Sequence, residues 1–337
     1  MAGRMSKESI VKKIKRFNEA IDNYINENMS IARKIILFVD FFYEYRFHGV
    51  YLQDYIQYEF YKKKAVERRN YIVFGRLLEI MHICNNPEHR YIFDEKPEFN
   101  KRFCQYIGRD WLNMKEAGRE DFEKFLEGKS HIFVKDPAGM FGKGVDIIFV
   151  NKAGDVDAIY EKLKSRKVLC EEVLVQCSEL AAFNESSANT MRIVTLICAD
   201  GTVKIMAGVL RIGRKGKFAD NFHHNGIAAL IDVETGIVKT TGVDRDFRRY
   251  VIHPDSGKPI VGFQVPEWEK IIDTVKKAAL VVPDMRYIGW DVAVNEKHEI
   301  ILIEGNPGAD PDVTQIPDQI GKWNEFEPIL REIKSLK

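Results

Sequence analysis

The chain has 337 residues, and its 51 Lys and Arg residues nearly balance its 50 Asp and Glu residues, for a net charge of +1. This balance gives no bulk electrostatic attraction to nucleic acid, and a hydrophobic content of 45% is typical of a soluble globular protein. The length allows two or three lobes. The five cysteines are scattered and form no CxxC pair, which argues against a disulfide framework or a zinc site and indicates a reducing compartment.

No segment carries a targeting or membrane-spanning signal. Met1–Lys15 is basic but lacks the apolar core of a signal peptide. The longest apolar run, Ile35–Val39, is interrupted by Asp40 and is too short to cross a bilayer. We therefore expect a soluble, cytoplasmic protein with no transmembrane segment and no nucleic-acid partner.

Residues 6–84 are predicted to be helical, because Gly and Pro are almost absent before Gly49 and apolar residues recur at helical spacing. A dense aromatic series crosses this segment, made of Phe41, Phe42, Tyr43, Tyr45, Phe47, Tyr51, Tyr55, Tyr58, Phe60 and Tyr61. Interleaved cations are compatible with a nucleic-acid surface, but the near-zero net charge favours aromatics that pack helix against helix. A membrane-surface or partner-docking role stays open, since amphipathic basic helices can serve either purpose.

The next segment mixes loops, helices and a strand. Asn86-Pro87 and Lys96-Pro97 predict loops. Helices are predicted at Arg102–Ile107 and Arg119–Leu126, before a strand at His131–Lys135. Lys101 stands at the start of the first helix, where a lysine is usually exposed, so it indicates little by itself.

A glycine-rich loop joins that strand to another at Asp146–Val150. Its glycines would let backbone amides approach phosphate oxygens, and Lys135 and Lys143 would supply positive charge. The glycines concerned are Gly139, Gly142 and Gly144. The loop does not match GxxxxGK[ST] and does not open a helix, so neither a P-loop nor a dinucleotide fold fits. A hairpin that covers phosphates is one interpretation, and a purely structural turn is the other.

A predicted helix at Val156–Ser165 leads to an apolar stretch, Lys167–Gln176, that two acids cross. Such a stretch suits a connection between lobes, where backbone groups bond an adenine edge and a nearby acid takes ribose hydroxyls. The candidates are Glu171, Glu172, Val173, Leu174 and, for the ribose, Glu179. An edge strand with two solvent-facing acids is equally compatible with the local sequence.

Met191–Ala199 and Thr202–Ile212 form the clearest predicted hairpin, closed by Asp200-Gly201. That turn pairs Arg192 with Val209 and Arg211 with Thr190, which puts both arginines diagonally on one face. Like charges side by side favour an anion between them, and a guanidinium grips phosphate or carboxylate. The alternative is that both arginines face water.

A polar loop follows at residues 213–226. Its adjacent histidines, His223 and His224, point to opposite faces if the chain is extended, so we do not expect a shared metal site. Either histidine is a candidate base or substrate contact. A strand pair is predicted within Ile227–Val238.

The C-terminal part contains predicted helices at Pro266–Val282 and Trp323–Leu336. Between them lie two predicted strands, Ile288–Val294 and Glu299–Ile303, joined by a polar turn.

Three oxygen ligands share one face of this second hairpin. The predicted register sets Asp291 opposite Leu302, so Asp291 and Glu304 become diagonal neighbours, and Asn306 lies on the same face. Two carboxylates and an amide oxygen suit Mg²⁺, which completes its shell with substrate phosphates. An exposed hairpin with solvated acids is the alternative.

Taken in order, these features resemble ATP-grasp enzymes, and most closely the sugar-transfer-associated branch found beside glycosyltransferases in bacterial surface-polysaccharide clusters. The resemblance covers about residues 85–319. It rests on Lys101, Lys135, the Gly139–Gly144 loop, Glu171-Glu172, Asn189-Thr190-Met191-Arg192, Arg211-Ile212-Gly213, Asp220-Asn221, and Gly289-Trp290-Asp291 with Glu304-Gly305-Asn306. One departure is Asn225, where the family pattern implies a second glycine.

The resemblance implies an α+β, ATP-grasp fold in which two lobes clasp a nucleotide. Residues 1–90 would form a helical N-terminal region, residues 91–175 the nucleotide lid lobe, and residues 176–337 the metal and substrate lobe. It also implies phosphate contacts from Lys101 and Lys135, closure of the Gly139–Gly144 loop, and adenine at the hinge. Mg²⁺ would lie on Asp291, Glu304 and Asn306.

The implied catalytic residues are Arg211, near the transferring phosphoryl group, and Arg192. The implied substrate contacts are Asn189, Asp220, Asn221, His223 and His224. The leading hypothesis is an ATP-dependent carboxylate–amine ligase that works through an acylphosphate, with ATP and Mg²⁺ as cofactors and small, sugar-linked substrates. A kinase for a hydroxyl, or a nucleotide-binding regulator that docks a glycosyltransferase, are the alternatives.

Overall fold

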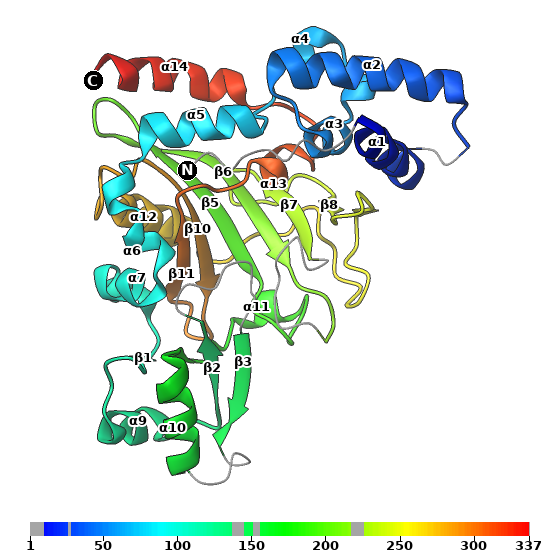
Figure 1. Cartoon of the computed structure of the whole chain (residues 1–337). Helices are drawn as coiled ribbons and strands as arrows, with labels where there is room; N and C mark the ends of the chain where they lie inside the picture. Colours follow the sequence, from blue (N-terminus) through cyan, green and yellow to red (C-terminus); the bar gives the residue numbers. More distant parts are fainter. Residues whose placement is uncertain (1–9, 26–27, 137–144, 151–155, 217–225, 337) are drawn as a thin grey trace.

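The computed structural model describes residues 10–25, 28–136, 145–150, 156–216 and 226–336. Two sheets of different size organise the chain, with the smaller sheet at the bottom of Figure 1 and the larger sheet above it. Helices cover both, as the α+β prediction requires.

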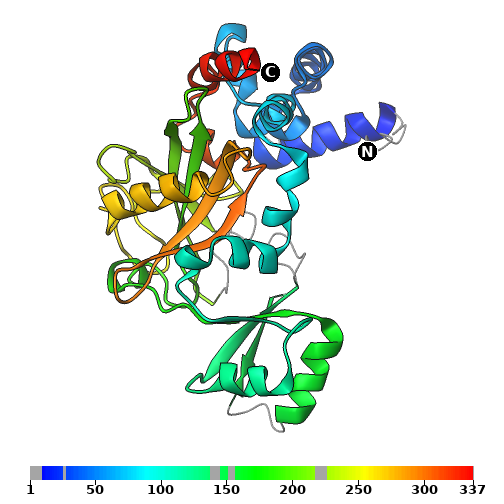
Figure 2. The same cartoon turned by 90° about the vertical axis from the view of Figure 1, so that its left-hand side faces the viewer.

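The smaller sheet has four antiparallel strands in the order β1-β4-β2-β3. These are β1 (Trp111–Asn113), β2 (His131–Lys135), β3 (Val145–Phe149) and β4 (Leu169–Glu172). Helices α9 (Arg119–Leu126) and α10 (Val156–Arg166) pack on it through a core that includes Phe122, Val134 and Leu163. Figure 2 shows this lobe below the rest of the molecule.

The larger sheet has seven antiparallel strands in the order β11-β10-β5-β6-β7-β8-β9. Its strands are β5 (Thr190–Ile197), β6 (Val203–Ile212), β7 (Ile227–Ile231), β8 (Gly242–Val243), β9 (Arg249–Tyr250), β10 (Tyr287–Val294) and β11 (Ile300–Asn306). Side chains alternate between faces along each strand. Ile193, Leu210 and Trp290 therefore share one face, which α12 (Trp268–Ala279) covers. Arg192, Arg211 and Asp291 belong to the other.

Short helices run beside the edge strand β11 and lead toward the small lobe. They are η2 (Pro87–His89), α6 (Tyr91–Asp94), α7 (Lys96–Arg102) and α8 (Cys104–Ile107). The sequence predicted a loop at Lys96-Pro97, but a helix begins there, with Pro97 in its first turn, where its missing N–H is not needed. Phe99 and Phe103 anchor these helices against Trp290 and its neighbours.

The second face of the large sheet is closed by helices from both ends of the chain (Figure 1). These are α1 (Ile10–Tyr24), α2 (Ile31–His48), α3 (Leu52–Gln57), η1 (Phe60–Lys62), α4 (Ala65–Arg68), α5 (Phe74–Cys84), α13 (Asp312–Gln315) and α14 (Trp323–Ser335). Helix α11 (Ser178–Ala181) lies at the hinge instead, and its Leu180 joins the core on the α12 face. Tyr55, Tyr58 and Phe60 pack with Leu230 of β7, while α5 and α14 cover Val194. The helical N-terminal region thus shares its core with the large lobe.

The aromatic series of the N-terminal region divides into two groups. Tyr55, Tyr58 and Phe60 are fully buried, which confirms the interpretation that aromatics pack helix against helix. Phe42, Tyr43 and Phe47 on α2 stay more than half exposed. Among the described residues, no helix is long and apolar enough to span a membrane.

Candidate active site

The centre of the site is Asp291 on β10, which lies between two arginines. It pairs directly with Arg192 on β5, and Arg211 on β6 lies diagonally beyond. Arg192 Nε and Nη2 donate to the carboxylate, the latter at 3.0 Å, and Arg211 Nη1 donates to both oxygens at 3.2 and 3.1 Å. Asp291 is buried.

The strand pairing that creates this arrangement was predictable. Arg192 pairs with Val209 and Thr190 with Arg211, as expected, although the turn is longer than two residues and a bulge near Val194 restores the register. The anion expected between the arginines is the chain's own carboxylate, so the alternative in which both face water is wrong. Burial alone would raise the pKa of Asp291, but the charges of Arg192 and Arg211 hold the pKa at about 2.

Glu304 on β11 lies directly opposite Asp291, and here the predicted register was wrong. Val294 pairs with Ile300, not Glu299, and a β-bulge between Asp291 and Val292 shifts the pairing once more. The two carboxylates are therefore direct neighbours, not diagonal ones. Burial and the adjacent Asp291 carboxylate both raise the pKa of Glu304.

These side chains fit a magnesium ion better than a metal held by protein alone. Asn306 Nδ2 donates to Glu304 Oε1 at 3.1 Å, so the amide stands beside the two carboxylates. The repulsion that raises the pKa of Glu304 is what a divalent cation would relieve. Two carboxylates and one amide are too few to complete an octahedral shell, and Mg²⁺ usually takes its remaining ligands from water and substrate phosphates.

Glu171 on β4 has a different position from either interpretation of its sequence. The strand lies between β1 and β2, and the side chain is buried rather than facing solvent. It accepts from Lys135 Nζ, from Arg109 Nη2 at 3.1 Å and from Asn100 Nδ2 at 3.1 Å. Burial would raise the pKa of Glu171, but Arg109 and Lys135 outweigh burial and leave the pKa well below its usual range.

Arg109 joins the lobes, and no motif or spacing in the sequence singles it out. Its guanidinium donates to Glu171 in the small sheet and to the Leu302 carbonyl of β11 at 2.9 Å. Because Leu302 lies two residues before Glu304, this side chain links the position of the small lobe to the carboxylate pair.

The lysine predicted to reach phosphates from α7 lies elsewhere. Lys101 is exposed and bonds Glu98 at 3.3 Å and Glu116 at 3.1 Å, so it faces the outside of the lobe. Lys96, at the other end of α7, is the one that faces the site. Burial lowers the pKa of Lys96, and Glu304 and Lys135 are among the charges that act on it. Sequence reasoning missed Lys96 because it read Lys96-Pro97 as a loop.

The hinge after β4 is tied to the turn between β10 and β11. Val175 O accepts from Glu296 N at 3.0 Å, and Cys177 N donates to Val294 O at 3.0 Å. Val173 and Leu174 are half-buried and Glu179 is exposed at this hinge, so their nucleotide contacts remain predictions. Glu172 bonds the Asp110 backbone, accepting from its N at 3.0 Å.

Asn189 is a structural residue rather than a substrate contact. It is fully buried, its Nδ2 donates to Gln176 Oε1, Leu180 O and Asn184 O, and its Oδ1 accepts from Gly213 N. With its donors and acceptor used inside the fold, it fixes the end of β6 after Arg211. The predicted residues Gly139, Gly142, Lys143, Gly144, Asp220, Asn221, His223 and His224 lie outside the described residues.

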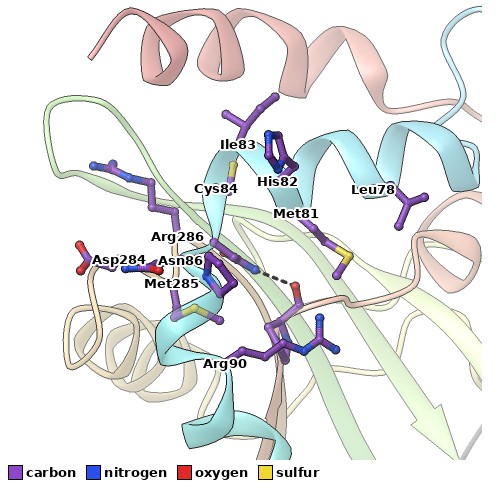
Figure 3. Close-up of a pocket in the computed structure, with 13 residues that line it drawn as sticks. Leu78, Met81, His82, Ile83, Cys84, Asn86, Arg90, Asp284, Met285 and Arg286 are labelled. Atoms are coloured by element: carbon purple, nitrogen blue, oxygen red, sulfur yellow. Dashed lines mark hydrogen bonds between the residues drawn. The ribbon is translucent and has the colours of Figure 1, made fainter. Parts of the chain in front are cut away.

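A cavity of about 650 Å³ lies apart from this constellation. Met81, His82, Arg90 and Met285 are among the residues that line it, and Figure 3 shows them around the loop that follows β11. It reaches Pro307 but none of the ionic residues above. The chemistry of the site therefore belongs to the charged cluster, not to this cavity.

Two α+β lobes joined by a hinge, with cations facing a carboxylate pair, are the arrangement that the resemblance to ATP-grasp enzymes implies. The sequence matches the family described as sugar-transfer associated ATP-grasp over residues 85–330, and the chain belongs to that family. Membership confirms the predicted fold and the class of ATP-grasp ligase, whose cofactors are ATP and Mg²⁺.

Three similar solved structures are distant in sequence. The ATP-grasp ligase PsnB complexed with minimal precursor has 12% identity and a TM-score of 0.47, over 77% of this chain and 69% of that one. D-alanyl-alanine synthetase A from Vibrio cholerae has 11% identity and a TM-score of 0.45, over 74% and 68%. N5-carboxyaminoimidazole synthase from Aspergillus clavatus has 12% identity and a TM-score of 0.40, over 69% and 50%. No curated protein matches the sequence. The family assignment rests on the match over residues 85–330.

Proposed function

We propose that the protein is an ATP-dependent carboxylate–amine ligase that works through an acylphosphate. The observation that carries the proposal is the Asp291 carboxylate, which accepts hydrogen bonds from Arg192 and Arg211. Glu304 and Asn306 lie beside it on the neighbouring strand. Two fixed guanidinium groups beside hard oxygen ligands suit the charge of a transferring phosphoryl group.

In the first step a substrate carboxylate oxygen attacks the γ-phosphorus of ATP, the bond to the β,γ-bridging oxygen breaks, and ADP leaves. In the second step an amine attacks the acyl carbon, inorganic phosphate leaves, and the amine nitrogen loses a proton. Mg²⁺ held by Asp291, Glu304 and Asn306 would neutralise charge on the β- and γ-phosphates.

Arg211 is assigned to the transferring phosphoryl group and Arg192 to the orientation of Asp291. Both guanidinium groups already lie on the reactive face, so little reorganisation is needed to bond phosphoryl oxygens. Lys135 and Lys96 are assigned to the nucleotide phosphates, because each lies among the acids of this cluster. Glu179, Val173 and Leu174 keep their assignment to the ribose and adenine at the hinge.

For substrates we propose a small carboxylate, a uronic acid or an amino acid, and an amine such as an amino sugar, in the synthesis of a surface polysaccharide or sugar conjugate in the cytoplasm. The family description supports the sugar context. A glycosyltransferase is the protein partner proposed on the same basis.

The test is ADP and phosphate release from MgATP with panels of sugar acids and amino acids, each with and without an amine. Release of both products that needs a carboxylate and an amine together supports the ligase. ADP release with a hydroxyl compound, without free phosphate, identifies a kinase. Tight MgATP binding without turnover on any member of the panels points to a regulator, and either of these two results contradicts the proposal.

A further inference from the structure

The outward face of α2 is more apolar than a water-exposed helix requires. Its exposed apolar residues are Ile31, Ile35, Ile36, Val39, Phe42, Tyr43 and Phe47, with exposed fractions between 53% and 77%. At about 100° per residue they cover an arc of about 160° along the whole helix. A surface this apolar on a soluble protein marks an interaction site. We call these seven residues the α2 stripe.

The acids of the same helix are turned inward, which inverts the usual pattern. Glu44 is buried and accepts from Arg68 at 3.1 Å and from Arg69 at 2.6 Å. Asp40 accepts from Arg68 at 2.9 Å and from the Tyr55 hydroxyl at 2.6 Å. The negative charge of α2 is thus neutralised within the fold, while its apolar residues face outward.

The exposed ionisable residues of α2 are all basic or histidine: Arg33, Arg46 and His48. Arg46 lies within the arc of the α2 stripe near its C-terminal end, with its guanidinium carbon 5.5 Å from the Phe47 ring centroid. A long cationic side chain among apolar residues suits a surface where the stem is buried and the charge reaches an anionic layer.

We propose that the α2 stripe docks on the headgroup region of a bilayer that contains anionic lipid. An amphipathic helix that lies flat, with its apolar face in the acyl boundary and cations among the headgroups, is the expected geometry. Helix α2 lies at the periphery of the molecule (Figure 1), and the exposed residues of the α2 stripe are accessible to a partner surface.

A second copy of the chain fits the α2 stripe less well. An antiparallel pair of α2 helices centred on Val39 brings Arg46 of one copy opposite Ala32 of the other, and a parallel pair brings Arg46 to Arg46. No acid on the exposed face of α2 can compensate Arg46 in either arrangement. Lipid phosphates supply that compensation, and charge complementarity therefore favours the bilayer.

The test uses the full-length protein and a matched pair of variants in vesicle flotation. Val39→Glu changes the α2 stripe, and Val251→Glu changes a valine of nearly equal exposure, 60% against 62%, that follows β9 and lies outside the α2 stripe. Vesicles of phosphatidylglycerol with phosphatidylcholine are compared with phosphatidylcholine alone. We expect Val39→Glu to weaken binding to the anionic vesicles at least about tenfold, and Val251→Glu to change it less than about twofold.

A third variant tests the charge. Arg46→Gln should reduce the preference for anionic vesicles about fivefold, and added salt should reduce it further. Unchanged melting temperatures show that the variants fold. The proposal is overturned if the wild-type protein does not float with anionic vesicles, or if Val39→Glu and Val251→Glu bind alike. It is also overturned if Val39→Glu abolishes only self-association in light scattering, or only binding of a glycosyltransferase.

Discussion

The ion cluster around Glu171 makes a quantitative prediction about stability. Its carboxylate is buried with Arg109 at 3.1 Å and with Lys135, and both cations are mostly buried as well. At that distance a unit pair is worth about 5 kcal/mol at an effective dielectric constant of about 20, and desolvation offsets part of this. Glu171→Gln keeps the shape but leaves the two cations without their shared counter-charge, so we expect a loss of about 3–5 kcal/mol.

The assay is urea denaturation followed by circular dichroism, with Glu172→Gln as the matched control. Glu172 is the next residue on the same strand and is half-buried, and within the described ranges its side chain accepts from one backbone amide, which Gln can also satisfy. We expect the control to change stability by less than about 0.5 kcal/mol. If Glu171→Gln costs no more than its neighbour, the ion cluster does not stabilise the small lobe and the reasoning is refuted.

The pH dependence of folding stability tests the same prediction in a second way. The pKa of Glu171 lies below its usual range in the folded chain, so the unfolded state binds the proton more readily. The stabilisation is complete above the unfolded pKa and is lost as the pH falls through the folded value. The stability gap between wild type and Glu171→Gln should therefore be constant near neutral pH and narrow in acid.

Three further predictions concern the site. Glu304→Gln removes the repulsion with Asp291, so it should keep or raise the melting temperature. The same change should lower turnover, measured by ADP release, at least about 100-fold, and normal turnover would contradict the assignment of Glu304 to the metal site. Lys96→Met should raise the KM for ATP at least about tenfold, while Lys101→Met stays within about twofold; equal effects would contradict the assignment of Lys96 to phosphates. Arg211→Lys should lower kcat about 100-fold in single-turnover kinetics and change the ATP affinity little in an ATP titration. A change in ATP affinity alone would contradict the assignment of Arg211 to the transferring phosphoryl group.

The sequence by itself determined the local elements and their chemistry. Side-chain alternation and turn residues are local properties of the chain, so the hairpin and the shared face of Arg192 and Arg211 were predicted from them. The predicted pairing of Arg192 with Val209 is right because a bulge near Val194 offsets a turn that is longer than two residues. The order of motifs was enough to indicate the family, because each motif lies within a few residues of sequence.

Tertiary structure alone decided which charges meet. The bulge that puts Glu304 directly opposite Asp291 depends on how β11 packs at the sheet edge, and no residue type in the sequence predicts this bulge. The sequence left Glu171 open between a hinge residue and a solvent-facing acid, and only the fold brings Arg109 and Lys135 from other segments to its buried carboxylate.

Helices α2 and α7 also have side-chain orientations that only the tertiary structure decided. The start of α7 decided that Lys96, not Lys101, faces the carboxylates. Periodicity predicted that α2 is helical, but only the fold showed that its acids point inward and its apolar side chains outward. Contacts between residues far apart in sequence depend on the packing of the whole chain, which a local pattern does not contain.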